Sequence, residues 1–289
     1  MQEENGLQLV AASRVSLTQR VAIMNAAYAD YYIPIRVTPE QLALMDQFYD
    51  VDTARSVVAR TRWECAGQAL LAIRRDQAWI SAVGVVPAWR RQGIARAMVR
   101  QLIEQAAAAG AQRVLLEVIS QNTPARRLYA SLGMHESREL LTWQRTADAD
   151  ALPIPQERLR VVPAADLLTH FGAWHDTPAS WQRDERTLQL MAHRLTGYQL
   201  EIRGRPAAYC LIGGGDDTVT IVDVGIDPEA GLLMPGRVLL QALAAHYLGH
   251  GLSIMNVPAD DPLNRILAAL GFLVILRQHE MSLSLPLPV

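Results

Sequence analysis

Apolar residues recur at helical spacing in several stretches of the first half of the chain. In the longest stretch Ile94, Met98 and Leu102 fall on one face, and Gly110 stands where a helix is expected to stop. A further short helix is expected to begin at Pro124, with Thr123 as its N-cap. The predicted helices cover residues 17–28, 38–48, 92–108 and 124–133.

Short runs rich in valine, isoleucine and leucine lie between these helices. Gly67 and the Arg75–Asp76 pair separate three of the runs, which is the pattern of strands joined by turns in an antiparallel meander. The run at 114–118 is almost continuously apolar and predicts a strand buried on both faces. The predicted strands cover residues 7–10, 56–59, 69–74, 78–85 and 114–118.

The second half of the chain repeats the first in outline. A shift of 141 residues brings VGVVP at 83–87 onto VGIDP at 224–228, and a shift of 138 brings LGM at 132–134 onto LGF at 270–272. Recurrence at a fixed spacing indicates two copies of one structural unit. We therefore expect two related α/β units in tandem.

A change of composition marks the boundary between the two copies. Small, acidic and proline residues without periodicity run from Thr146 to Glu157, as is typical of a linker. The predicted organisation is an N-terminal domain at 1–147, a linker at 148–156 and a C-terminal domain at 157–289. A chain of 289 residues is long enough for two hydrophobic cores.

Composition narrows the class of protein. Half of the residues are hydrophobic and 19% are charged, which is ordinary for a globular chain. The acidic N-terminus lacks the apolar segment of a signal peptide, and the longest apolar run, 266–276, is too short to span a bilayer. Cys65 and Cys210 stand far apart without metal-ligand spacing. We expect a cytoplasmic protein that does not enter a membrane.

The net charge of −2 conceals an asymmetry. Residues 1–147 hold 17 arginines against 13 acidic residues, whereas the remainder holds 10 against 16. The basic residues are spread out and do not form the clustered surface that nucleic acid requires. No nucleic-acid partner is expected, although one small anion would suit the first half.

One junction in the first half has the features of an anion site. A strand ends at Val85, and PAWRRQGIAR then leads into the long helix. Free amides at a helix N-terminus bind phosphate, and Gly93 lets the phosphate approach the backbone closely. Arg90, Arg91 and Arg96 add positive charge. From these residues alone, an ordinary strand–helix turn is an equally good interpretation; the GK[ST] ending of a P-loop is absent from the sequence.

These residues resemble a known family. Arg90-x-x-Gly93-x-Ala95 is similar to the Q/R-x-x-G-x-G/A pyrophosphate motif of the GCN5-related N-acetyltransferases (GNAT), and LEVISQNTPARRLYASLGM at 116–134 resembles their second conserved block. The resemblance covers residues 7–145 well and the second half in outline. It implies two tandem units of the α/β (α+β) class, each a mixed, mostly antiparallel twisted sheet flanked by helices.

The same resemblance implies the reaction and its residues. An acetyl or other short acyl group would pass from acyl-CoA, acting as co-substrate without a metal, to a primary amine that attacks the thioester directly. Tyr129 would protonate the leaving thiolate, Glu117 would take a proton from the amine, and the Val85 amide would bind the carbonyl oxygen. The implied acyl-CoA-binding residues are Val83, Gly84, Val85, Arg90, Arg91, Gln92, Gly93, Ile94, Ala95, Arg96, Asn122, Ala125 and Tyr129.

Each catalytic assignment has a purely structural alternative. Tyr129 is also interpretable as a half-buried helix aromatic, and Glu117 as a strand acid bonded to backbone or arginine. A water relay in place of Glu117 is a further alternative for the base. Tyr28, Tyr31 and Tyr32, together with nearby acidic residues, predict a surface for a cationic amine, small or peptidic; two solvated helices would give the same pattern.

The second copy lacks the residues of this chemistry. Under the shift of 141, Met234 replaces Gly93; under the shift of 138, Leu267 replaces Tyr129 and Met255 replaces Glu117. His246 and His250 lack the glutamate of HExxH, so we expect no metal site. We predict a degenerate second domain, in a monomer that imitates a dimer or in a homodimer. Two competing functions are an acyl-CoA-binding regulator without turnover and a structural pseudo-dimer.

Overall fold

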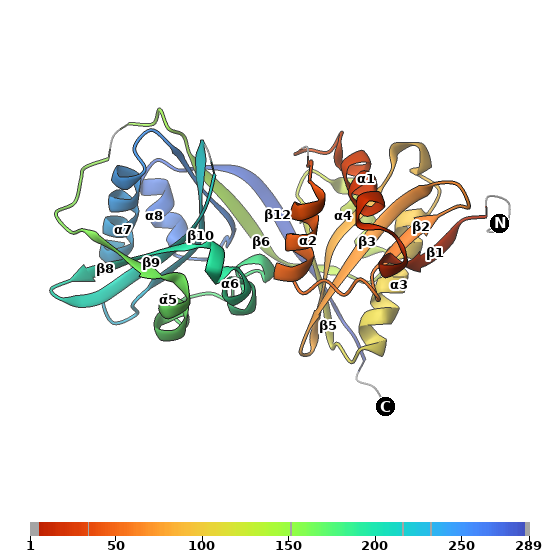
Figure 1. The fold of residues 1–289 in the computed structure, drawn as a ribbon. Helices are drawn as coiled ribbons and strands as arrows, with labels where there is room; N and C mark the ends of the chain where they lie inside the picture. Colours follow the sequence, from red (N-terminus) through yellow and green to blue (C-terminus); the bar gives the residue numbers. More distant parts are fainter. Residues whose placement is uncertain (1–5, 34, 151, 216, 232, 287–289) are drawn as a thin grey trace. The chain divides into compact units, whose positions relative to one another are not determined.

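The computed structural model describes residues 6–286 except 34, 151, 216 and 232. Contacts divide the chain into two compact units (Figure 1). Unit 1 consists of residues 1–137 together with 279–289, and unit 2 consists of residues 138–278. Each unit is described separately below.

Unit 1 is a mixed sheet with helices on both faces. Its strands follow the order β1-β2-β3-β4-β5-β12, antiparallel from β1 to β4 and parallel between β4 and β5. The strands are β1 (Gln8–Ala11), β2 (Val57–Arg60), β3 (Cys65–Arg74), β4 (Gln77–Val85), β5 (Arg113–Ile119) and the end of β12 (Leu273–Ser284); the helices are α1 (Leu17–Tyr28), α2 (Pro39–Phe48), α3 (Ile94–Ala108) and α4 (Thr123–Ala130).

The alternation of side chains along β3 divides the core of unit 1 between two faces. Leu71 faces α3, where it packs with Met98 and Leu102. Its neighbour Leu70 faces the opposite way and packs with Met24 of α1. The predicted elements of this unit all form, with ends that differ by a few residues.

Unit 2 repeats the element order of unit 1. Its strands run in the order β6-β11-β10-β9-β8-β7, and β10 and β11 form the parallel pair. The strands are β7 (Leu159–Pro163), β8 (Thr196–Ile202), β9 (Arg205–Gly213), β10 (Thr218–Ile226), β11 (Gly251–Pro258) and most of β6 (His135–Arg145); the helices are α5 (Ala164–Phe171), α6 (Glu185–Met191), α7 (Leu233–His246) and α8 (Leu263–Ala269). The expected fold class, two tandem α/β units with mixed sheets, is confirmed.

The sixth strand of each unit comes from the other half of the chain. In unit 1 Met281 of β12 is buried in the core beside α3, and the Ser137 hydroxyl donates to the Glu280 carbonyl at 3.0 Å. In unit 2 Trp143 of β6 is buried in the core, and β6 pairs antiparallel with β11. The expected domain boundary at residue 147 assumes that each domain is one continuous segment. The compact units instead divide within β6 and β12, because Trp143 of β6 is buried in the core of unit 2 and Met281 of β12 in the core of unit 1.

The predicted N-cap of α4 is wrong by one residue. Asn122 is the N-cap, and its side-chain oxygen accepts from the Ala125 amide at 3.2 Å. Thr123 is already the first helical residue, followed by Pro124. Asparagine is a better N-cap than threonine, and the shift carries Asn122 to the edge of the helix where it also contacts Tyr31.

Membrane insertion has no structural counterpart in the described part of the chain. None of its helices combines the length and the apolar character that a bilayer span requires.

Met281→Ala tests the exchange of terminal strands. Truncating this side chain, which is 2% exposed, is expected to lower the free energy of unfolding by about 2–5 kcal/mol. Hydrogen exchange should quicken in β5 and α4 of unit 1 while β10 and β11 keep their protection. Met255→Ala, at a residue 45% exposed in unit 2, is the control and should change little. Faster exchange confined to unit 2 after Met281→Ala would contradict the exchange.

Candidate active site

Strands β4 and β5 of unit 1 part from one another before either ends. Parallel pairing joins residues 77–79 to residues 113–115, and no further pair joins the two fully described strands. On its other side β4 bulges against β3, with one residue, Ser81, left out of the register. A bulge bends its strand and redirects the residues that follow. The result is a gap between residues 80–85 of β4 and residues 116–119 of β5.

Alternation of backbone groups along β4 directs two amides into this gap. The Val86 amide donates to the Ala66 carbonyl of β3 at 2.9 Å, so Val83 and Val85 direct their amides away from β3. The Tyr28 hydroxyl satisfies both backbone groups of Val83: it accepts from the Val83 amide at 3.2 Å and donates to the Val83 carbonyl at 3.1 Å. The Val85 amide therefore faces the gap, where a carbonyl oxygen can meet it.

Gly84 has a packing role between these two valines. A Cβ atom at Gly84 would lie 2.8 Å from the Ala27 Cβ and 3.0 Å from the Tyr28 ring. Helix α1 thus lies directly against the β4 backbone, and this contact brings Tyr28 to Val83. Gly84 is also one of the residues predicted to bind acyl-CoA, and its surroundings give it a packing role besides.

The turn after β4 leads into α3 through a left-handed glycine. Gly93 is the N-cap of α3 with φ +80°, and a Cβ atom there would meet no heavy atom within 4 Å. Ile94, 3% exposed, anchors the first turn in the core, while Arg91 is exposed with φ +65°. The first-turn amides of α3, including that of Ala95, thus begin beside open space, as an anion site at a helix N-terminus requires.

Two side chains of the turn are held by neighbours. Arg96 donates to the Ser131 hydroxyl after α4 at 2.8 Å, and Gln92 donates to the Ala88 carbonyl at 3.5 Å. Arg96 therefore connects the start of α3 to the end of α4.

Arg90 joins the turn to helix α1. Its guanidinium donates two hydrogen bonds to the Asp30 carboxylate at 2.6 and 2.7 Å, one to the Ala27 carbonyl at 3.0 Å and one to the Val85 carbonyl at 3.1 Å. The hydrogen bond from Arg90 lowers the pKa of the Asp30 carboxyl, and Asp30 in turn raises the pKa of Arg90. Arg90 thereby fixes the turn against the end of α1, a structural role in addition to any contact with phosphate.

Tyr129 lies beside the gap: it packs in the cluster that Val83 and Val85 contact, and its phenol is influenced by the Tyr28 hydroxyl that is bonded to Val83. The side chain is 7% exposed and packs in the α3 core. Burial, and then the neighbouring hydroxyls of Tyr28 and Tyr31, raise the pKa of the Tyr129 phenol. The phenol therefore stays protonated at neutral pH and can donate a hydrogen bond but not act as a base.

A row of tyrosines connects α1 to the start of α4. Tyr28 and Tyr31 meet edge to face with ring centroids 5.1 Å apart, and Tyr31 and Tyr32 meet in the same way at 5.4 Å. The Asn122 amide donates to the Tyr31 hydroxyl at 3.4 Å, and the Tyr32 hydroxyl donates to the Gln121 carbonyl at 3.2 Å. The predicted acceptor residues and the predicted site residues of α4 therefore come together at one end of the gap.

Glu117 has a different set of neighbours. The Trp79 indole N–H donates to its carboxylate at 2.7 Å, and the ring of Tyr49 meets Trp79 edge to face at 5.5 Å. Burial and then Glu117 raise the pKa of Tyr49. Sequence reasoning placed Tyr49 on the acceptor side with the other tyrosines but missed Trp79. The available signal was that a tryptophan in a buried strand needs an acceptor for its N–H.

The corresponding gap of unit 2 is occupied by the chain itself. Under the shift of 141, Ile226 corresponds to Val85, and its amide donates to the Trp174 carbonyl at 3.1 Å. Asp223 nearby is fully buried and accepts from Tyr209 at 2.8 Å. Burial alone would raise the pKa of Asp223, but His175 at 3.0 Å and Arg183 hold it below its usual range. The Ile226 amide of β10 is therefore not available to a ligand in the way that the Val85 amide of β4 is.

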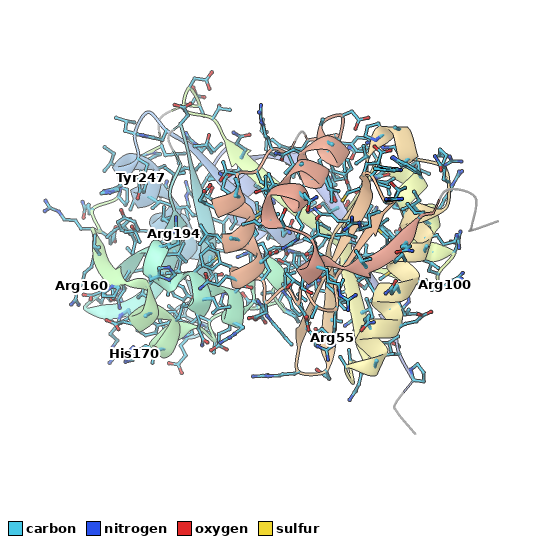
Figure 2. The ribbon with its side chains drawn as sticks, turned by 45° about the vertical axis from the view of Figure 1, so that its right-hand side comes forward. Arg55, Arg100, Arg160, His170, Arg194 and Tyr247 are labelled. Atoms are coloured by element: carbon cyan, nitrogen blue, oxygen red, sulfur yellow. The ribbon has the colours of Figure 1, made fainter. Side chains whose placement is uncertain are left out.

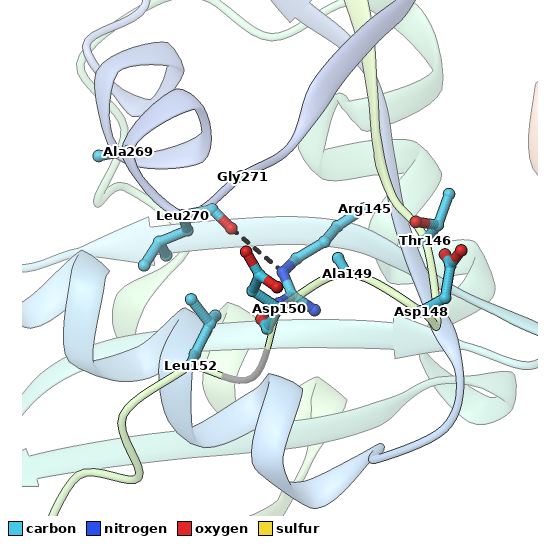
Figure 3. Close-up of a pocket in the computed structure, with 9 residues that line it drawn as sticks. All are labelled: Arg145, Thr146, Asp148, Ala149, Asp150, Leu152, Ala269, Leu270 and Gly271. Carbon is cyan, nitrogen blue, oxygen red and sulfur yellow. Dashed lines mark hydrogen bonds between the residues drawn. The ribbon is translucent and has the colours of Figure 1, made fainter.

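One cavity of unit 2 is lined by none of these residues. A hollow of about 540 Å³ in unit 2 lies between the linker and the end of α8 (Figure 3). Arg145 crosses it and donates to the carbonyls of Leu270 and Asp150. None of its nine lining residues belongs to the predicted site, so we interpret it as the place where the linker packs.

A metal site has no counterpart among the described residues. No group of three or more histidine, cysteine, aspartate or glutamate side chains there has the arrangement to hold an ion. His246 instead shares a hydrogen bond with the Tyr198 hydroxyl at 3.1 Å.

Comparison with known proteins identifies the class as an acetyltransferase. A profile described as the Acetyltransferase (GNAT) family matches residues 21–134, and one described as the Acetyltransferase (GNAT) domain matches residues 135–261. The chain belongs to the GNAT acetyltransferase family.

Individual relatives resemble parts or all of the chain. The [Ribosomal protein bS18]-alanine N-acetyltransferase of Escherichia coli (strain K12) is 32% identical over 83 residues, which make up 29% of this chain and 56% of that protein. The chain thus spans about half the length of the curated relatives it matches.

Solved structures extend the likeness to both units. A GCN5-related N-acetyltransferase from Sphaerobacter thermophilus has a TM-score of 0.70 at 18% identity, covering 96% of this chain and 95% of that one. A tandem GNAT protein from the clavulanic acid biosynthesis pathway has a TM-score of 0.68 at 17% identity, covering 96% and 98%. At these identities the likeness concerns the tandem fold.

Gly84→Ala tests the contact between α1 and β4. The added methyl group is expected to lower the free energy of unfolding by about 1–3 kcal/mol, because α1 must move away from the strand. Ala27→Gly in the same chain removes the nearest atom and should recover part of the loss, although glycine within a helix itself costs about 1 kcal/mol. Urea unfolding of the two single variants and the double variant gives the coupling; strictly additive effects would refute the contact.

Proposed function

We propose that unit 1 transfers an acetyl or other short acyl group from acyl-CoA to a primary amine of a small molecule or peptide. The observation that carries this proposal is the gap between β4 and β5, with the Val85 amide directed into it and the protonated, buried Tyr129 beside it. Membership of the GNAT family supports acetyl-CoA as the donor.

The turn from Arg90 to Arg96 would hold the phosphates of the donor. The open space in front of Gly93 fits a pyrophosphate on the first-turn amides of α3, and exposed Arg91 adds charge. Ile94 keeps that turn in place from the core side. Acetyl-CoA supplies the activated thioester, whereas Val85, Tyr129 and Glu117 would supply charge stabilisation and proton transfer.

The Val85 amide would stabilise the negative charge that develops on the thioester oxygen. A fixed amide needs no reorganisation during the reaction, and loss of one such donor typically reduces the rate by about 10²–10³-fold. As the amine nitrogen bonds to the acyl carbon, the carbon–sulfur bond breaks and the thiolate leaves. Tyr129 donates its hydrogen bond, and finally its proton, to that sulfur.

Glu117 would accept the proton that the amine loses, directly or through a water. The Trp79 indole N–H donates to the Glu117 carboxylate at 2.7 Å. Trp79 and Leu115 form the last pair between β4 and β5, so Glu117 lies where the two strands begin to part. The hydrogen bond from Trp79 holds the carboxylate in a fixed orientation. Tyr28, Tyr31 and Tyr32 would surround the acceptor.

The similarity to an enzyme that acetylates an alanine of ribosomal protein bS18 supports an amine acceptor in this protein as well. Unit 2 would bind no acyl-CoA, because the Trp174 carbonyl already occupies the amide of Ile226. The protein would then carry one active site per chain.

Tyr129→Phe and Glu117→Gln test the two catalytic roles. Each change removes one proton-transfer group and is expected to lower kcat by about 10²–10⁴-fold, whereas acetyl-CoA should still bind, because the phosphate turn is unchanged. Thiol release against a panel of amines measures kcat, and calorimetry measures binding.

Tyr247→Phe in unit 2 is the matched control and should keep the natural rate. Full activity of Tyr129→Phe would remove Tyr129 from the mechanism. Binding of acetyl-CoA by the natural protein without turnover on any amine would refute the transferase and favour a regulator.

A further inference from the structure

Most of the acidic side chains in residues 28–52, the stretch that begins with the tyrosine row, are paired with arginines. Residues 28–52 contain five acids, four of which form ion pairs with arginines of unit 1. These pairs are Asp30 with Arg90 at 2.6 Å, Asp46 with Arg20 at 2.8 Å, Asp50 with Arg74 at 2.8 Å and Asp52 with Arg55 at 2.6 Å. Arg55 is labelled in Figure 2.

Close opposite charges cancel beyond their immediate surroundings, so these acids give little field at the site. The fifth acid, Glu40, lies in the first turn of α2, where hydrogen bonds from its own backbone and from Thr38 lower its pKa. Arg36 adds an exposed positive charge to the segment between α1 and α2. Within residues 28–52 and their arginine partners, a cationic acceptor would find no excess of negative charge.

The same segment exposes large apolar side chains. Tyr32 is 54% exposed, Ile33 44% and Ile35 37%. Single exposed apolar residues are ordinary, but a cluster next to a reaction site indicates a binding surface. The Tyr32 hydroxyl donates to the Gln121 carbonyl, next to the N-cap of α4, so this segment is attached through Tyr32 to the start of the helix that carries Tyr129.

From this arrangement we infer that the acceptor of unit 1 is an amine bearing an apolar group and no second positive charge. The apolar group lies against Tyr32, Ile33 and Ile35, and the reacting nitrogen enters the gap beside Tyr31. This inference rests on the proposed acyl transfer and adds the class of its acceptor. It replaces the cationic surface expected from sequence, because the acids on which that expectation depended are paired.

Two amines of nearly equal shape test the inference. Hexylamine and 1,5-diaminopentane differ by a terminal methyl group in place of an ammonium group. We expect kcat/KM for hexylamine to exceed that for the diamine by at least about tenfold, the size of discrimination that apolar pockets achieve. The ratio should persist at high salt, since it depends on apolar contact and desolvation.

Ile35→Asp should reduce this ratio about tenfold by placing an unpaired carboxylate in the cluster. Ile154→Asp, at an equally apolar residue that is 80% exposed in unit 2, is the matched control and should leave the ratio unchanged. Preference of the natural protein for the diamine, or an unchanged ratio in Ile35→Asp, would overturn the inference while leaving acyl transfer intact. Absence of thiol release with every amine would instead refute the proposed function.

Discussion

Three residue pairs hold β4 and β5 together, and the early end of this pairing determines the remainder of the site. A parallel pair normally satisfies its inner amides along its whole length. Here the bulge opposite Leu70 and Leu71 redirects β4, and Val83 and Val85 lose a strand partner. Tyr28 satisfies Val83, so a single valine amide remains directed into the gap. The contact of α1 with Gly84, and hence the placement of the tyrosines, depends on the same bend.

The amide that faces the gap between the parallel strands is open in unit 1 and bonded to the chain in unit 2. In unit 1 a side chain, that of Tyr28, enters the gap and satisfies the Val83 amide, and the Val85 amide remains directed into the gap. In unit 2 the backbone carbonyl of Trp174 reaches the equivalent amide of Ile226, and a buried cluster around Asp223 fixes His175 beside it. Replacing a buried and paired carboxylate is difficult, since any single change leaves a charge without its partners. The second unit has the same fold, but the Trp174 carbonyl lies where a ligand would have to bind the Ile226 amide.

Sequence periodicity predicted the elements of unit 1 and the tandem repeat, because these depend on local spacing. The turn at Gly93 and the contact of Asn122 with the tyrosines are also local or follow from motif order. Pairings across the sheet were not predictable: the bond of Trp79 to Glu117 joins residues 38 apart, and that of Arg90 to Asp30 joins residues 60 apart. The exchange of β6 and β12 was missed for the same reason, as each strand has the composition to fit either unit. The N-cap at Asn122 was missed because Thr123 is also a good cap by type.

Titration of the full-length protein with acetyl-CoA tests most directly that one donor site exists and lies in unit 1. Gly93 and Gly231 share a backbone conformation, with φ +80° and +75° and open space in front of each, although the internal repeat aligns Gly93 with Met234. One molecule of acetyl-CoA should bind per chain, Gly93→Val should weaken binding at least about tenfold by strain and obstruction at a position that needs positive φ, and Gly231→Val should leave it unchanged. Binding of two molecules per chain, or equal weakening by both changes, would contradict a single site in unit 1.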